Sequence, residues 1–180
     1  MRLMNVLLAA GCLVLAATGC ATVPETAGDR AKLDVQVKQT VDRMSAADPN
    51  IEKFMDSAYA YVVFPAIGSG AAIVGGGFGR GQVFRNGDVI GFASVTQGTV
   101  GAQAGGSNYS EMIFFEDKWT FQKFAAGEFA FQASGAAVAV ESGDGGNVNY
   151  SDGVMVFTQG YKGLMLQIAI GAQQFKYVPD

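Results

Sequence analysis

The chain of 180 residues has 12 basic and 16 acidic side chains and no histidine. The lack of histidine excludes a Ser-His-Asp triad and removes the commonest metal ligand of proteins. Both cysteines, Cys12 and Cys20, lie in the first twenty residues, which excludes a cysteine-based zinc site and a disulfide-rich scaffold. The acidic balance disfavours a broad nucleic-acid-binding surface, so nucleic acid is not an expected partner.

The N-terminal residues have the pattern of a bacterial export signal. Arg2 precedes an uncharged apolar stretch, residues 3–17, whose length is typical of a signal-peptide core rather than of a membrane span. The stretch ends in Ala17-Thr18-Gly19-Cys20, which resembles the lipobox of bacterial lipoproteins. This resemblance implies cleavage before Cys20 and acylation of Cys20, so residues 1–19 are interpreted as a lipoprotein signal peptide. The alternative is an ordinary signal peptide that leaves Cys20 as a free thiol.

Residues 20–29 are predicted to form a lipidated tether, because they are small, polar and interrupted by proline and glycine. Two or three acyl chains anchor a protein stably, since each buried CH₂ contributes about 0.8 kcal/mol. Ala21, rather than Asp, follows the cysteine, which resembles the sorting signal of outer-membrane lipoproteins. We therefore expect a lipid-anchored protein of the bacterial outer membrane that faces the periplasm, with residues 30–180 as its domain.

Residues 30–57 have a helical pattern. Apolar residues recur every three or four positions and form one stripe, which consists of Leu33, Val37, Val41 and Met44. Asp48-Pro49 then predicts an N-cap and the first residue of a shorter helix. The two helices are expected to cover one face of a sheet. The alternative is that the first helix lies on a membrane.

Beyond residue 58 the chain becomes rich in glycine, with 22 of its 25 glycines at or after Gly68. Asn86-Gly87 between two apolar runs predicts a two-residue hairpin, and Asp152-Gly153 and Lys162-Gly163 predict further turns. One short helix is expected between Asp117 as its cap and Gly127 as its end. Glycines within strands indicate bends and close backbone approach. The predicted fold is therefore α+β: a strongly curved antiparallel sheet, or a small barrel-like β core, with N-terminal helices and one inserted helix.

The sequence has few motifs that are typical of catalytic or ligand-binding sites. The glycine-rich stretch 75–81 (GGGFGRG) lacks the Gly-Lys-Ser/Thr ending of a phosphate loop, and residues 144–152 (DGGNVNYSD) have Gly146 where a calcium loop needs Asp or Asn. Glu111 and Glu116 flank an apolar run and could form an acid/base pair, but positions at strand ends on the surface explain them equally well. No cofactor, metal or catalytic residue is expected.

Residues 60–84 (AYVVFPAIGSGAAIVGGGFGRGQVF) resemble the signature of the SYLF domain, a family of lipid-binding modules. Further agreement lies in residues 101–105 (GAQAG), residues 137–143 (AVAVESG) and Lys162-Gly163-Leu164, so that the resemblance spans residues 30–178. Eukaryotic relatives bind phosphoinositides, and fungal relatives also bind and bundle actin. Bacterial relatives are often secreted or lipid-anchored. The resemblance thus implies phospholipid head groups and a membrane surface as partners.

A phospholipid needs cationic or N–H donors for its head group and apolar contacts for its chains. Six residues are interpreted as lipid contacts on this basis: Lys32 and Lys38 on the first helix, Phe64, Phe78 and Arg80 in the signature, and Lys162 at a predicted turn. Each cation can equally be an ordinary solvated surface charge. The acidic net charge favours local head-group recognition over general electrostatic attraction.

Three functions remain open from the sequence. The first is a non-catalytic lipoprotein of the bacterial envelope that binds phospholipids or phosphoinositide-type lipids. The second is an envelope protein–protein interaction or structural module with an actin-binding-like surface. The third is a small outer-membrane β-barrel, and an enzyme is the least favoured class. Vesicle binding by the unlipidated domain would separate the first function from the second.

Overall fold

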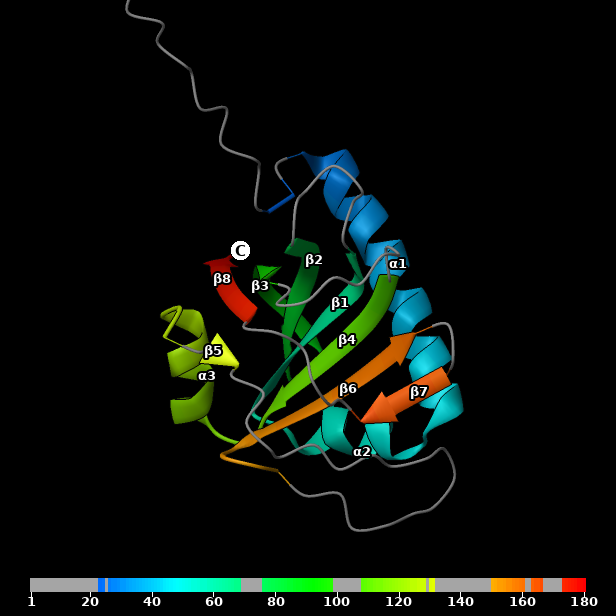
Figure 1. The fold of residues 1–180 in the computed structure, drawn as a ribbon, viewed down its shortest axis with the longest axis vertical. Helices are drawn as coiled ribbons and strands as arrows, with labels where there is room; N and C mark the ends of the chain where they lie inside the picture. Colours follow the sequence, from blue (N-terminus) through cyan, green and yellow to red (C-terminus); the bar gives the residue numbers. More distant parts are fainter. Residues whose placement is uncertain are drawn as a thin grey trace, which may run out of the picture.

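The computed structural model describes residues 23–24, 26–68, 76–98, 108–128, 130–131, 150–160, 163–166 and 173–180 (Figure 1). The helices in these ranges are α1 (Ala27–Ala47), α2 (Asn50–Ser57) and α3 (Lys118–Ala125). The strands are β1 (Ala60–Gly68), β2 (Gly76–Arg85), β3 (Asp88–Gly98), β4 (Asn108–Phe115), β5 (Ala130–Phe131), β6 (Val154–Gly160), β7 (Gly163–Leu166) and β8 (Gln173–Pro179). Of the helices described, none is long and apolar enough to span a membrane.

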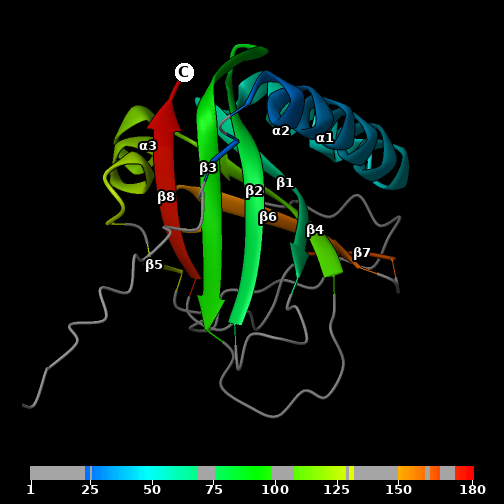
Figure 2. The ribbon, with the colours of Figure 1, turned by 90° about the horizontal axis from the view of Figure 1, so that it is seen from above.

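The described strands form one antiparallel sheet in the order β5-β8-β3-β2-β1-β4-β6-β7. Helices together with this sheet confirm the predicted α+β fold. Within the described residues the sheet is open, with β5 and β7 at its two edges, so the strongly curved sheet is the alternative that is confirmed. Helices α1 and α2 lie on one flank of the sheet and α3 lies on the other, beside β8 (Figure 2).

Local signals account for the helix ends. The Thr26 hydroxyl accepts a hydrogen bond from the Asp29 backbone N–H at 3.0 Å, so α1 begins at Ala27 and includes the last three residues that the sequence assigned to the tether. The Asp48 carboxylate accepts from the Asn50 N–H at 2.9 Å, and α2 begins one residue later than Pro49, its predicted first residue. The predicted apolar stripe of α1 faces the sheet, with Leu33, Val37 and Met44 buried and Val41 partly buried.

The predicted turns within the described residues are also present. Asn86 and Gly87 have φ angles of 52° and 85°, the left-handed pair that a two-residue hairpin requires, and they join β2 to β3. Asp152 and Gly153 have φ angles of 51° and 76° and precede β6. The predicted turn at Lys162-Gly163 includes a residue outside the described ranges.

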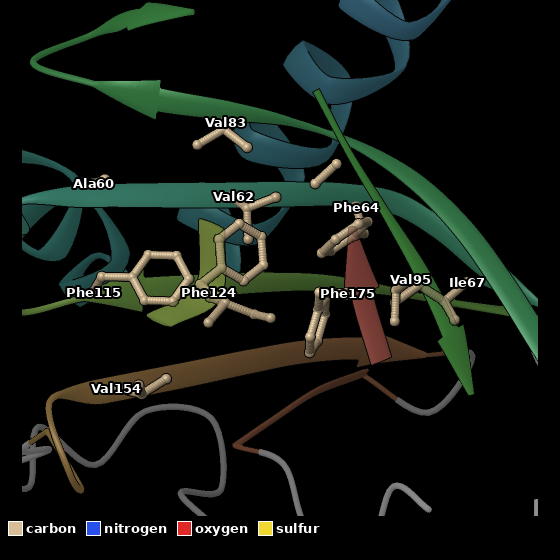
Figure 3. Packing of buried hydrophobic residues seen from close by; sticks show 12 residues of the cluster. Ala60, Val62, Phe64, Ile67, Val83, Val95, Phe115, Phe124, Val154 and Phe175 are labelled. Carbon is tan, nitrogen blue, oxygen red and sulfur yellow. The ribbon is translucent and has the colours of Figure 1, made fainter. Parts of the chain in front are cut away.

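The sheet separates two hydrophobic cores. The helix-side core lies under α1 and α2 and is formed by Leu33, Val37, Met44, Ile51, Tyr61, Val63, Phe92, Met112, Phe114, Met155 and Phe157. The concave core lies on the opposite face, with α3 packed on it, and is formed by Ala60, Val62, Phe64, Ile67, Val83, Ala93, Val95, Ile113, Phe115, Phe124, Val154 and Phe175 (Figure 3). Both faces of β1 are therefore apolar, which explains why residues 60–68 carry no charge.

The concave core shows how strongly the sheet curls. β8 and β1 are three strands apart in the sheet, which would separate them by about 14 Å if the sheet were flat. The Phe175 ring on β8 nevertheless lies 5.9 Å from the Phe64 ring on β1. A register shift around Pro65 bends β1 and brings both Phe64 and Ile67 into this core. Small residues on β2 leave room for them, since Gly79 and Gly81 lie directly against Ile67 and Phe64.

Arg43 connects α1 to the strands beneath it. Its Nε donates to Gln159 Oε1 at 2.7 Å, and its Nη2 donates to Ser110 Oγ at 3.0 Å. We expect Arg43→Ala to lower the free energy of unfolding by about 1–2 kcal/mol, because hydrogen bonds to β4 and β6 are lost together. Urea denaturation would measure this. Lys38→Ala is the control, since the exposed Lys38–Asp42 pair at 3.6 Å should contribute under about 0.5 kcal/mol. An equal loss in both variants would contradict the expectation.

Candidate functional site

A cluster of polar side chains lies within the concave face of the sheet. Tyr109 and Glu111 come from β4, Gln97 from β3 and Gln173 from β8. Alternate residues of β4 point to the same face, so Tyr109 and Glu111 share it with Ile113 of the concave core. The strong curl of the sheet then brings β8 across to β4. We call these four residues the polar cluster.

Hydrogen bonds join the polar cluster across three strands. Gln173 Nε2 lies 3.4 and 3.3 Å from the two carboxyl oxygens of Glu111 and donates to Tyr109 Oη at 3.2 Å. Tyr109 Oη in turn donates to Gln97 Oε1 at 2.8 Å. Gln173 thus bridges an acid and a phenol that lie two residues apart on β4.

The electrostatics of the polar cluster follow from its burial. Glu111 is fully buried, and this burial raises the pKa of its carboxyl to about 8, while the hydrogen bond from Gln173 acts in the opposite direction. Burial and the neighbouring Glu111 carboxyl both raise the pKa of Tyr109. The ion pairs found among the described residues, Arg30–Asp180 and Lys38–Asp42, do not include Glu111. At neutral pH the carboxyl is therefore mainly protonated and can donate a hydrogen bond.

The surface interpretation of Glu111 is wrong. Glu111 lies inside β4 with none of its side chain exposed, whereas Glu116 follows the end of β4 and is exposed. The two carboxylates are five residues apart along an extended chain, about 17 Å, and do not form an acid/base pair. The signal for burial was present in the sequence, because Glu111 alternates with Tyr109, Ile113 and Phe115.

The predicted lipid contacts fall on different parts of the domain. Lys32 and Lys38 are exposed on α1. Phe78 and Arg80 lie on the helix-side face of β2, four and two residues before Gln82, whose amide donates to Asp34 of α1. Arg80 is half-buried, with its guanidinium carbon 5.7 Å from the centre of the Phe78 ring.

Phe64, in contrast, is fully buried in the concave core, on the other side of the sheet from Arg80. The structure therefore does not bring Phe64 together with the cations. Cys20 and Lys162 lie outside the described residues. The four predicted contacts that share the helix-bearing side are Lys32, Lys38, Phe78 and Arg80.

Within the described part of the chain, no group of three or more Asp, Glu, Cys or His side chains is placed to hold a metal ion. The polar cluster offers a protonated acid, two amides and a phenol, which can exchange a proton and donate or accept hydrogen bonds. No protein-family model and no curated protein matches this chain. The resemblance to the SYLF domain therefore stays a prediction from the sequence.

Proposed function

We propose that this protein is a non-catalytic phospholipid-binding lipoprotein of the bacterial envelope. An acyl anchor on Cys20 would hold it at the outer membrane, with the domain facing the periplasm. The lipobox pattern and the resemblance to the SYLF domain support this proposal, as does a chain without histidine and with no cysteine beyond Cys20. The second candidate, a docking module for another envelope protein, is kept as an outcome of the test below.

The observation that carries the proposal is the position of α1 relative to the anchor. α1 begins seven residues after Cys20, and seven residues span at most about 25 Å. Pro24 is buried and Val23 packs against the helix-side core, so the start of the described chain is attached to the domain. A bilayer that holds the acyl chains of Cys20 would therefore lie close to the first turns of α1.

The outer surface of α1 has suitable chemistry for lipid head groups. Its apolar stripe is buried against the sheet, and Lys32 and Lys38 extend from the remaining surface into solvent. A lysine near an anionic bilayer contributes about 1 kcal/mol to binding. Because the whole chain is acidic, we expect this attraction to act locally and to be sensitive to salt.

Flotation with vesicles tests the proposal. The chain from residue 20 with Cys20→Ser keeps every described residue and lacks the acyl anchor. We expect it to float with vesicles that contain phosphatidylglycerol, cardiolipin or phosphoinositide and to float less with pure phosphatidylcholine. The double variant Lys32→Glu/Lys38→Glu should bind at least about tenfold more weakly.

Lys53→Glu is the matched control, because Lys53 is an exposed helical lysine on α2, away from the start of α1. It should bind like the parent chain. A loss in the control equal to that of either single variant, Lys32→Glu or Lys38→Glu, which changes the net charge by the same amount, would indicate a general charge effect rather than a contact at α1. Failure to float with any vesicle would favour the protein-docking function.

A further inference from the structure

The only tryptophan of the chain is on the surface. Trp119 of α3 is 67% exposed, more than Val35 and Val89, the other large apolar side chains that are exposed among the described residues. Tryptophan is usually buried at least in part, because its ring is large and apolar. An indole that is two-thirds exposed is therefore unusual, and its neighbours decide what it can contact.

The position of Trp119 is fixed by the packing of α3. The Asp117 carboxylate accepts a hydrogen bond from the Thr120 N–H at 2.8 Å and caps the helix. On the inner side of α3, the Phe124 ring lies 4.8 Å from the Phe115 ring and 5.4 Å from the Phe175 ring. With Thr120 and Phe124 buried, helix geometry directs Trp119 outward.

Two lysines accompany the indole. Lys118 precedes it and is exposed, and Lys123 Nζ lies 5.4 Å from the centre of the Trp119 ring. Of the two acids before the helix, Asp117 accepts the capping hydrogen bond, and Glu116 is exposed before the helix begins. A tryptophan flanked by lysines is the combination that occupies the interface between lipid head groups and acyl chains, with the ring in the apolar boundary and the amines at the phosphates.

The location of α3 is compatible with the proposed anchor. The Phe121 ring of α3 lies 5.7 Å from the Tyr177 ring near the end of β8. Asp180, the residue after β8, receives a hydrogen bond from Arg30 in the first turns of α1 at 2.6 Å. α3 and the start of α1 are therefore both attached to the C-terminal end of β8, although they lie on opposite flanks of the sheet (Figure 2).

We propose that Trp119, with Lys118 and Lys123, inserts into the head-group region of the phospholipid membrane and forms a contact separate from that of α1. This inference rests on the proposed function, since it names a second surface by which the domain would meet the bilayer. A phospholipid surface explains the exposed indole and its neighbouring cations together.

The fluorescence of the single tryptophan tests the inference directly. In the lipidated chain, bound to phosphatidylglycerol-containing vesicles through its acyl anchor, we expect the Trp119 emission to shift to shorter wavelength. Lipids brominated near the head of the acyl chain should quench it. In the unlipidated Cys20→Ser chain, Trp119→Ala should weaken vesicle binding by about tenfold. Gln122→Ala, at an exposed position of the same helix, should leave binding unchanged.

The outcomes separate this inference from the proposed function. If the Cys20→Ser chain floats but Trp119 shows neither a shift nor quenching in either form, the inference is overturned and the proposed function stands. If the Cys20→Ser chain does not float with any vesicle, the proposed function fails. A Trp119→Ala variant that unfolds, judged by circular dichroism, is replaced by the neutral variant Trp119→Gln, which should likewise bind more weakly.

Discussion

Glu111→Gln is expected to remove a large pH dependence of stability. The native state binds a proton at Glu111 up to about pH 8, whereas the unfolded chain releases it near the ordinary glutamate pKa of 4.5. Between these values the native state holds the extra proton, so stability falls as pH rises, by about 1.4 kcal/mol per pH unit. The contribution is fully present below the unfolded pKa and is lost as pH rises through the folded pKa. Glutamine is neutral throughout and cannot show this loss.

Urea denaturation at a series of pH values would measure the effect. The wild-type free energy of unfolding should decline by several kcal/mol across the interval from about 4.5 to about 8, while Glu111→Gln should remain nearly level. Glu116→Gln is the matched control, because Glu116 is an exposed acid just beyond the same strand. It should keep the wild-type slope. Equal slopes in all three proteins would mean that Glu111 does not hold a proton in the native state.

The parts of the fold that were predictable depend on short-range signals. Asn86-Gly87 forces the β2–β3 hairpin by itself, and Asp117 caps α3 through a residue three positions away. The buried face of α1 follows from the helical spacing of its own apolar residues. In each case the residues that decide the structure lie within a few positions of one another. These signals can therefore be recognised in the sequence before the order of the strands is known.

The polar cluster was not predictable in this way. Glu111 and Gln173 are 62 residues apart in the chain and meet only because the sheet curls until β8 faces β4. The composition of the glycine-rich region predicted the curl but not which strands it brings together. Without that pairing, the alternation along β4 indicates that Glu111 is buried but not which side chain it meets.

The predicted lipid contacts illustrate a second limit. Phe64 and Arg80 belong to the same signature stretch, and both were predicted to contact lipid. Alternation along β1 places Phe64 in the concave core together with Val62, and alternation along β2 places Arg80 on the helix-bearing side. In a two-sided sheet, one residue of register decides which face a side chain joins.

Gly81→Ala is expected to lower the free energy of unfolding strongly, because β2 approaches β1 closely at this position. A Cβ at Gly81 would lie 2.4 Å from the carbonyl oxygen of Val63 and 2.7 Å from Cδ1 of Phe64. The first of these atoms is backbone of the paired strand, and the second belongs to a fully buried ring that packs on Phe175. Neither can move without displacing β1 or the concave core. We expect a loss of about 3 kcal/mol in the free energy of unfolding.

Gly77→Ala provides the control on the same strand. The nearest atom to a Cβ there is the side-chain oxygen Gln97 Oε1, at 3.4 Å, so alanine needs only a small adjustment and should change stability by less than about 1 kcal/mol. Thermal and urea denaturation would measure the free energy of unfolding of both variants. The comparison shows what the same substitution costs when the new Cβ meets a backbone oxygen and when it does not. If Gly81→Ala proved as stable as Gly77→Ala, the spacing of β1 and β2 would not depend on a missing side chain. The curl that places Gln173 against Glu111 would then need another cause, with the bulge at Pro65 the next feature of β1 to test.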